Sequence, residues 1–231
     1  MPRVELKRMK GSLYCAPTNT ANVAVASHAD FAVTAGSIEL WFKTGTLQDA
    51  AGVYNLFTIR IDNSNYIQFC LRNTVTIGGF YLGAAGVVTL SLTTTGYSFD
   101  NGAWQHAVAT WGPLGAFVYV NGVQKGTQAG NKTSTFGSNP TLAIANWVTI
   151  GNPYIGALAG IRFYNVALTQ AQALQRYQGA DIQTGLVSDW RCDNMTGITV
   201  TDYKSAHNGT ISDITKIYWS NNTPVKERRG R

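Results

Sequence analysis

The feature that most constrains this chain is a succession of short segments rich in β-branched and aromatic residues, each followed by Gly, Asn, Asp or Pro. The first group of residues favours extended backbone, and the second favours turns. Many short strands at such spacing predict an antiparallel sandwich or jelly roll. The predicted strands cover 37–44, 55–62, 66–72, 87–94, 105–111, 116–122, 147–151 and 158–168.

One segment departs from this pattern and predicts a short helix near 169–178. Thr169 can cap its N-terminus, and Gly179 can end it. Its expected apolar face consists of Ala171, Leu174 and Tyr177. A helix of this length is unstable alone, so we expect it to pack against the sandwich. The predicted fold class is therefore all-β: an antiparallel two-sheet jelly-roll sandwich with one short helix.

The net charge of +6 belongs to the two ends of the chain, because residues 11–225 contain ten basic and ten acidic side chains. This indicates a basic N-terminal arm (1–14) and a basic C-terminal tail (212–231). Their basic residues are Arg3, Lys7, Arg8, Lys10, Lys226, Arg228, Arg229 and Arg231. We expect these residues to bind other protein subunits. A body without net charge argues against a nucleic-acid-binding face on the domain.

A membrane-spanning helix and a secretory signal are not expected from this sequence. No segment approaches the roughly 20 consecutive apolar residues of a membrane helix, and the basic start of the chain is not followed by the apolar run of a secretory signal. The three cysteines, Cys15, Cys70 and Cys192, are odd in number and far apart, without the spacing of a zinc site. We expect them to be small buried hydrophobic residues.

The segment AWQHAVATWGPLGAFVYVNG (103–122) predicts a central hairpin, with strands joined by the turn GPLG. Asn-Gly at 121–122 predicts a second tight turn, of type I′. Alternation places His106 and Val108 on one face of the first strand, and Ala107, Ala109 and Trp111 on the other. We expect His106 to satisfy a hydrogen bond rather than to act as a ligand or base.

This hairpin resembles the W-x-H-V-A-x-T…L-Y-V-(D/N)-G hairpin of the laminin G-like jelly roll, in the concanavalin A-like lectin/glucanase superfamily. Two further segments are similar in the same order: NTANVAVASHADFAVTAGSIELWFKT (19–44) and YIGALAGIRFYNVALTQAQALQRY (154–177). The resemblance covers about 19–177 and implies a jelly roll. The superfamily includes glycosidases, lectins and interaction modules, so the fold alone does not choose a function.

A fourth match, GLVSDWRCDNMTGITVTDYKSAHNGTI (185–211), resembles the segment that usually opens such a domain. Because the resemblance implies that the first and last strands are neighbours, we expect 185–211 to pack as a displaced edge strand of a sandwich spanning 15–211. The alternative is a truncated repeat that pairs with another subunit. In either case Leu186, Val187 and Trp190 are expected to be buried.

No catalytic residues are predicted. Glycoside hydrolysis needs two carboxylates facing each other, and the glucanases of the family carry E-x-D-x-x-E on one strand. The corresponding segment here, SIELWFK, offers Glu39 alone, and neither G-x-S-x-G nor H-E-x-x-H occurs. The chain is therefore predicted not to be an enzyme.

No cofactor is expected, and calcium is the one alternative, because the resemblance includes relatives that bind it at the rim of the sandwich. Asp62, Asp193 and Asp202 would form a site if they converged, since calcium takes six to eight oxygen ligands. The alternative is that each carboxylate caps a turn.

A sugar site needs an exposed aromatic ring with polar neighbours. Trp41, Trp104 and Trp190 coincide with core positions of the family motifs and are expected to be buried. Aromatic residues near turns are the better candidates for a ligand site. These are Tyr97, Trp111, Trp147 and Tyr154.

Two functions follow. The first hypothesis is a non-enzymatic structural or decoration component of a larger, homo-oligomeric assembly, with a bacteriophage virion as the example. Its sandwich would project outward, while residues 1–14 and 220–231 would make intermolecular contacts. The alternative is a lectin-like adhesion module that binds host-surface glycans at an extracellular or cell-surface location.

Overall fold

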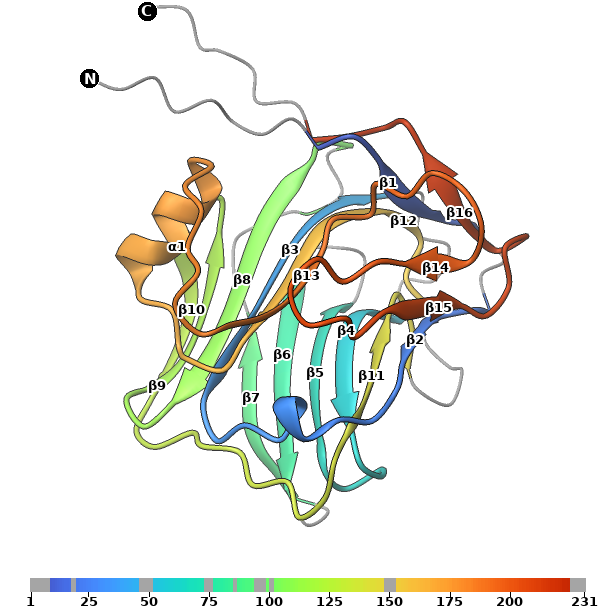
Figure 1. The fold of residues 1–231 in the computed structure, drawn as a ribbon. Helices are drawn as coiled ribbons and strands as arrows, with labels where there is room; N and C mark the ends of the chain where they lie inside the picture. The colour runs from blue at the N-terminus through green and yellow to red at the C-terminus, as the bar shows by residue number, and fades with distance from the viewer. Residues whose placement is uncertain are drawn as a thin grey trace, which may run out of the picture.

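The structure is a computed structural model that describes residues 9–17, 20–45, 52–72, 77–84, 87–93, 99, 102–147 and 153–224. Two antiparallel sheets pack face to face, which confirms the predicted sandwich (Figure 1). In sheet A the strands lie in the order β10 (Val123–Ala129), β9 (Gly115–Val120), β8 (Gln105–Gly112), β3 (Gly36–Thr44), β12 (Gly156–Tyr164), β1 (Ser12–Cys15) and β16 (Ile217–Ser220), with β13 (Leu186–Trp190) also paired to β12.

Sheet B has eight strands, and its middle is built from β11, β4 and β5. The order is β14 (Thr199–Val200), β15 (Gly209–Ile211), β2 (Val23–Val25), β11 (Thr141–Ile144), β4 (Val53–Arg60), β5 (Tyr66–Arg72), β6 (Ile77–Ala84) and β7 (Val87–Thr93). The strand predicted at 147–151 falls largely outside the described residues, and Trp147 lies just after β11.

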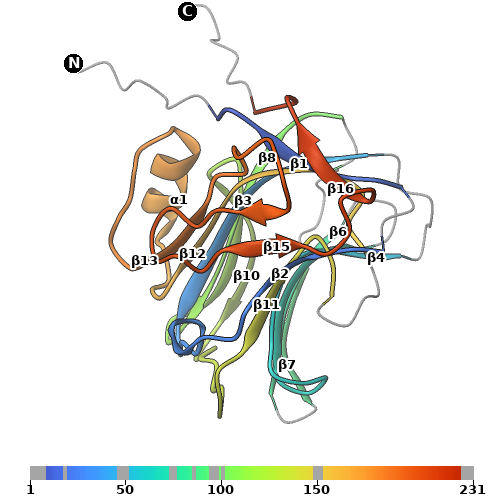
Figure 2. The ribbon, with the colours of Figure 1, turned by 45° about the vertical axis from the view of Figure 1, so that its right-hand side comes forward.

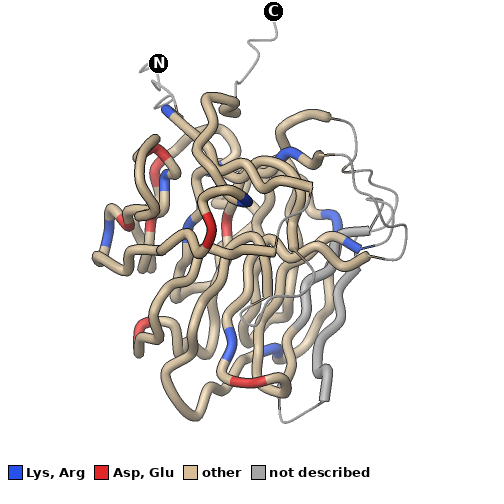
Figure 3. The backbone as a smooth tube through the Cα atoms, turned by 90° about the vertical axis from the view of Figure 1, so that its right-hand side faces the viewer, with Lys and Arg blue, Asp and Glu red and all other residues tan. Residues whose placement is uncertain are grey.

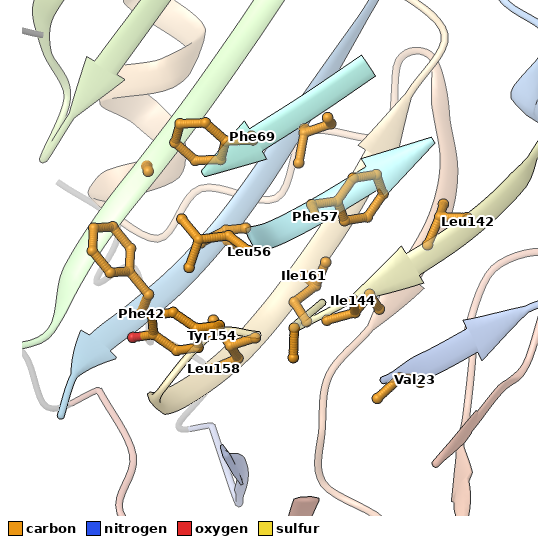
Figure 4. Packing of buried hydrophobic residues seen from close by; sticks show 14 of the residues in the cluster. Val23, Phe42, Leu56, Phe57, Phe69, Leu142, Ile144, Tyr154, Leu158 and Ile161 are labelled. Atoms are coloured by element: carbon orange, nitrogen blue, oxygen red, sulfur yellow. The ribbon is translucent and has the colours of Figure 1, made fainter. Parts of the chain in front are cut away.

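The core between the sheets consists of the inward-facing residues of both. Figure 4 shows side chains from β3, β4, β11 and β12 meeting there, including Phe42, Phe57, Ile144 and Leu158. Charged residues are sparse along the strands (Figure 3). The three cysteines are buried and unpaired, as expected. In the described part of the chain, no helix combines the length and apolar character needed to cross a membrane.

The hairpin at 103–122 has the expected form. Asn121 and Gly122 have φ of 52° and 77°, the paired positive values that a type I′ turn requires, and they join β9 to β10. Ala107, Ala109 and Trp111 face the core, while Val108 belongs to a second cluster on the outer face of sheet A.

Residues 185–211 pair within the same chain and contribute to both sheets. β13 extends sheet A beside β12, and β14 and β15 form the edge of sheet B beside β2. Leu186, Val187 and Trp190 are buried, as expected.

The sandwich extends beyond the boundaries 15 and 211 at both ends. β1 pairs with β12 and with β16, so the two ends of the described chain lie side by side in sheet A (Figures 1 and 2). The arms are therefore shorter than expected, because Ser12–Tyr14 and Ile217–Ser220 pair within their own chain.

The predicted helix is α1 (Gln170–Tyr177), and Thr169 caps it in a capping box with Gln172. It packs on the outer face of sheet A, over a small apolar cluster of Val108, Tyr119, Tyr164, Leu168, Ala173 and Leu186. The predicted buried face is wrong in part: Tyr177 is partly buried and stacks on Trp41, but Ala171 and Leu174 are exposed, and Ala173 is the buried residue. Arg176, three residues after Ala173, also faces sheet A and forms an ion pair with the buried Glu39 carboxylate.

Candidate functional site

A groove lies on the outer face of sheet B, over β15, β2 and β11. It is shallow and open to solvent, with a volume of about 400 Å³. The groove exists because the outward positions of the middle strands carry small side chains: Ala143 of β11 pairs with Ala24 of β2, which pairs with Thr210 of β15. The lining residues are Asn22, Ala24, Val25, Ala26, Thr141, Leu142, Ala143, Asn208 and Thr210.

Trp147 and Tyr66 form an aromatic pair next to this groove. Their rings meet edge to face with centroids 5.0 Å apart, and both side chains are half-buried. The Arg60 guanidinium lies over the indole, 5.4 Å from its centroid. Gly83 makes room for the tyrosine, since a Cβ there would lie 2.8 Å from the Tyr66 ring.

Two hydrogen bonds join groove-lining residues to Trp147 and to Arg60, whose guanidinium lies over the indole. The Asn22 side chain, which lines the groove, donates to the carbonyl of Trp147 over 3.5 Å, and Thr141 Oγ1 donates to the carbonyl of Arg60 over 3.1 Å. Trp147 follows β11 and Tyr66 begins β5, with β4 between the two strands. We call the groove and this aromatic pair together the sheet B site.

The polar residues at the sheet B site come from alternate positions of β4 and β5. Asn55, Thr58 and Arg60 alternate with the core residues of β4, and Gln68 lies opposite Thr58 in β5. The Gln68 amide donates to Asn55 Oδ1. Asn55 and Thr58 are fully buried, and Arg60 and Gln68 are nearly so. Thr58 Oγ1 has no hydrogen-bond partner among the described residues.

The sequence predicted one aromatic residue of this site and misassigned two others. Trp147 is half-buried and has polar neighbours. Trp111 and Tyr154 are fully buried in the core, because alternation turns Trp111 inward from β8, where its Nε1 donates to Ser134 Oγ, and Tyr154 packs between the sheets (Figure 4). Tyr97 lies outside the described residues.

Two of the tryptophans expected in the core are instead half-buried. Trp41 lies on the outer face of sheet A and stacks on Tyr177 of α1, with ring centroids 5.9 Å apart. Trp104 donates its Nε1 hydrogen to Asn222 Oδ1 over 3.1 Å. Trp190 is buried, as expected.

The predicted calcium ligands do not converge. Asp62 lies in the β4–β5 turn, and its Oδ1 accepts the backbone N–H groups of Ser64 and Asn65. Hydrogen bonds from the Asn65 side chain and the turn amides hold the pKa of Asp62 below its ordinary value. Asp202 is buried and bridged to Trp190 of sheet A. Asp193 is only partly buried, and no described cluster of metal-binding side chains contains any of these three aspartates.

The hydrogen bonds of Asp202 explain why it is unavailable to a metal. Its carboxylate accepts backbone N–H groups from Asp189, Lys204 and His207 at 2.8–3.1 Å. Asp202 and Asp62 therefore stabilise loops, as the turn-capping alternative predicted.

The one acidic residue of the SIELWFK strand, Glu39, is buried beneath α1. It accepts hydrogen bonds from Arg176 Nε at 2.9 Å and Tyr164 Oη at 2.8 Å, and His106 Nε2 lies 3.1 Å away. Burial alone would raise the pKa of Glu39, but the charge of Arg176 and the bond to His106 hold it well below its ordinary value. An ionised carboxylate with 1% side-chain exposure cannot reach a substrate.

A laminin G-like family model, described as the concanavalin A-like lectin/glucanases superfamily, matches residues 17–173, more than half of the chain. The chain belongs to this superfamily. The match coincides closely with the stretch whose motifs resemble the family. Among curated protein sequences, none matches the chain significantly.

Solved structures show the same fold at low sequence identity. A candidate carbohydrate-binding protein from Bacteroides ovatus has a TM-score of 0.71 at 14% identity, over 95% of this chain and 62% of its own. The chain therefore spans less than two thirds of that protein. Domains LG4–5 of the mouse laminin α1 chain have a TM-score of 0.54 at 12% identity, over 77% of this chain and 45% of their own.

A third similar structure is the CBM40 of the Ruminococcus gnavus IT-sialidase, bound to α2,3 sialyllactose. Its TM-score is 0.54 at 10% identity, over 71% of this chain and 97% of its own. This module belongs to a sialidase, so the fold occurs within enzymes as well as in binding proteins. Likeness at this level of identity shows the fold alone.

Proposed function

We propose that the chain is a carbohydrate-binding module whose ligand occupies the sheet B site. The observation that carries this proposal is the half-buried Tyr66–Trp147 pair beside a groove lined by asparagine and threonine side chains. An aromatic wall next to a few fixed polar groups is the usual composition of a small-ligand site.

The chemistry of a sugar fits both parts of this surface. One face of a pyranose ring consists of C–H groups that can lie against an indole, and its hydroxyls both donate and accept hydrogen bonds. The Asn22, Asn208 and Thr210 side chains at the groove offer such partners. The aromatic rings would supply contact area at little cost in conformational entropy.

The similar structures support a binding role in general terms. The B. ovatus protein is described as a candidate carbohydrate-binding protein, and the R. gnavus module was solved with a sialylated sugar. The burial of Glu39 supports binding without turnover. A glycan-binding role also favours an extracellular or cell-surface location.

The hypothesis of a virion component stays a prediction. Seven of the eight basic residues assigned to assembly contacts lie outside the described residues, with Lys10 the exception. None of the three similar structures is described as part of a virus particle.

A glycan array with the intact chain tests the proposal, followed by titration of the best ligand against Trp147→Ala. We expect at least a tenfold loss of affinity, about 1.4 kcal/mol. The matched control is Tyr218→Ala, because Tyr218 is 42% exposed and pairs with Tyr14 at 5.3 Å on sheet A. Its affinity should stay within twofold of the unmodified chain.

Either of two results would overturn the proposal. One is an array without signal above background. The other is a glycan bound equally well by Trp147→Ala, which would place the ligand elsewhere on the molecule.

A further inference from the structure

Three side chains that could hold a metal ion meet where β2 and β15 pair. His28 precedes the short 3-10 helix η1 (Ala29–Phe31), which contains Asp30, and His207 directly precedes Asn208 and β15. The register pairs Gly209 with Val25, so the residues before β15 lie beside those that follow β2. Two segments almost 180 residues apart are thereby brought together.

The spacing of the three groups matches a metal site. Asp30 Oδ2 lies 3.3 Å from His207 Nε2 and 3.4 Å from His28 Nδ1, and the three ligand atoms all lie within 4.8 Å of one another. Zinc bonds of about 2.0–2.1 Å in tetrahedral geometry separate neighbouring ligand atoms by roughly 3.3–3.4 Å. Both separations have this length, but His28 Nδ1 also accepts the Asp30 backbone N–H over 3.2 Å, so zinc bound at Nδ1 would replace this cap of η1.

The His207 ring is oriented by groups behind it. Its Nδ1 lies 3.1 Å from Ser188 Oγ and 3.5 Å from Asp202 Oδ2, which leaves Nε2 facing Asp30. Asp202 is fully buried and held by backbone N–H groups, so it is a fixed support. A carboxylate behind the distal nitrogen of a ligating histidine is a recurrent feature of zinc sites.

Ser188, His207 and Asp30 follow one another as in a catalytic triad, with Ser188 at one ring nitrogen of His207 and Asp30 at the other. The arrangement nevertheless does not suit nucleophilic catalysis. Ser188 is fully buried on β13, so its hydroxyl cannot reach a substrate. Asp30 and His28 have about half of their side-chain surface exposed, so the accessible side of the cluster is the one on which they lie.

We infer that His28, Asp30 and His207 bind a zinc ion. Two imidazoles and one carboxylate suit zinc, and they suit calcium poorly because calcium takes six to eight oxygen ligands. Three protein ligands leave one tetrahedral position for water or for an oxygen of a ligand. Ala26 and Asn208 line the groove and flank the cluster in sequence, so the ion lies near one end of the groove.

The test is isothermal titration of the tag-free intact chain with zinc chloride, after treatment with chelator. We expect one zinc per chain, no comparable binding of calcium, and a melting temperature raised by roughly 5–10 °C when zinc exceeds Kd a hundredfold. Asp30→Asn and His28→Asn should each weaken zinc binding at least about tenfold. Both variants should fold, because the sites are half-exposed and asparagine can still cap η1.

Asp62→Asn is the matched control, since it removes an exposed turn carboxylate outside the cluster. Its zinc affinity should equal that of the unmodified chain. The inference fails if zinc does not bind at micromolar concentration, or if Asp30→Asn and His28→Asn bind it as tightly as the unmodified chain. Zinc titration needs no glycan, so it is independent of the proposed carbohydrate binding.

Discussion

The outer faces of the two sheets have opposite surroundings. On sheet A the outward residues Glu39, His106 and Tyr164 are fully buried, because α1 covers them and Arg176 neutralises the carboxylate. On sheet B the outward residues of β2 and β11 are small and leave a groove, with Trp147 beside it. The face with more ionisable side chains is the closed one.

This difference shows that ionisable chemistry on a strand does not by itself indicate a site. The charges of sheet A hold the helix, as Asp181 shows: it lies 2.9 Å from Arg162 Nη1 and 3.6 Å from Arg176 Nη1. On sheet B the polar residues of β4 and β5 are also buried, but Asn208 and Thr210 at the groove are exposed, and Tyr66 and Trp147 are partly exposed. Substitutions on one face can therefore be compared with substitutions on the other.

The largest effect is expected from removing the central carboxylate of sheet A. Glu39→Ala leaves the mostly buried Arg176 guanidinium without its main partner, so the free energy of unfolding should fall by about 3–5 kcal/mol. Urea denaturation measures it. Replacing both residues with leucine should cost less than the single change, because no charge is left unpaired. A loss below 1 kcal/mol for Glu39→Ala would mean that the cluster does not hold α1.

The same carboxylate predicts how stability depends on pH. The pKa of Glu39 is lowered in the folded chain, so its contribution is complete above the unfolded pKa of about 4.3 and is lost as pH falls toward the folded value. Stability should therefore fall below about pH 4.3 less steeply in Glu39→Gln than in the unmodified chain. The stability of the variant should still depend on pH, because three other carboxyl groups also have lowered pKa values: Asp62, Asp181 and Asp213. Parallel curves from urea titrations between pH 3 and 6 would contradict this.

On sheet B, a bulky side chain in the groove should abolish binding without unfolding the protein. Ala24 points outward and is exposed, so Ala24→Tyr places a ring where the ligand is proposed to lie. Affinity for the glycan should drop at least about tenfold, with less than about 1 kcal/mol change in stability. Thr127→Tyr, an exposed position of β10 in sheet A, is the control. If the two variants bind the glycan equally well, the groove is not part of the binding site.

The sequence predicted the fold better than the site, for physical reasons. Strand segments and the Asn-Gly turn depend on local backbone preferences, so β3, β5 and the type I′ turn appear as expected. Burial depends on which neighbours cover a face. Trp111 and Trp147 both lie near turns, yet one belongs to the core and the other borders the groove.

The Glu39 cluster, the metal cluster and the groove all depend on contacts between residues that are far apart in the sequence. Nothing near Glu39 in sequence indicates its pairing with Arg176, 137 residues away. The same holds for His28 and His207, which only the β2–β15 pairing brings together. The small residues that form the groove, such as Ala24 and Ala143, carry no chemical signal at all.

The smallest effect is expected from the N-terminal cap of α1, and it tests whether the outer faces of the two sheets are independent. Thr169 closes the capping box of α1, accepting the Gln172 backbone N–H at 3.3 Å while Gln172 Oε1 accepts the Thr169 N–H at 2.9 Å. Thr169→Ala should lower the free energy of unfolding by about 1 kcal/mol, because one end of the helix loses its capping bonds. Glycan affinity should not change, since α1 lies on sheet A and the sheet B site is on the opposite outer face. Urea denaturation and titration of the same glycan measure the two quantities on one sample. A loss of glycan affinity greater than twofold in this variant would show that binding on sheet B depends on the helix that covers sheet A.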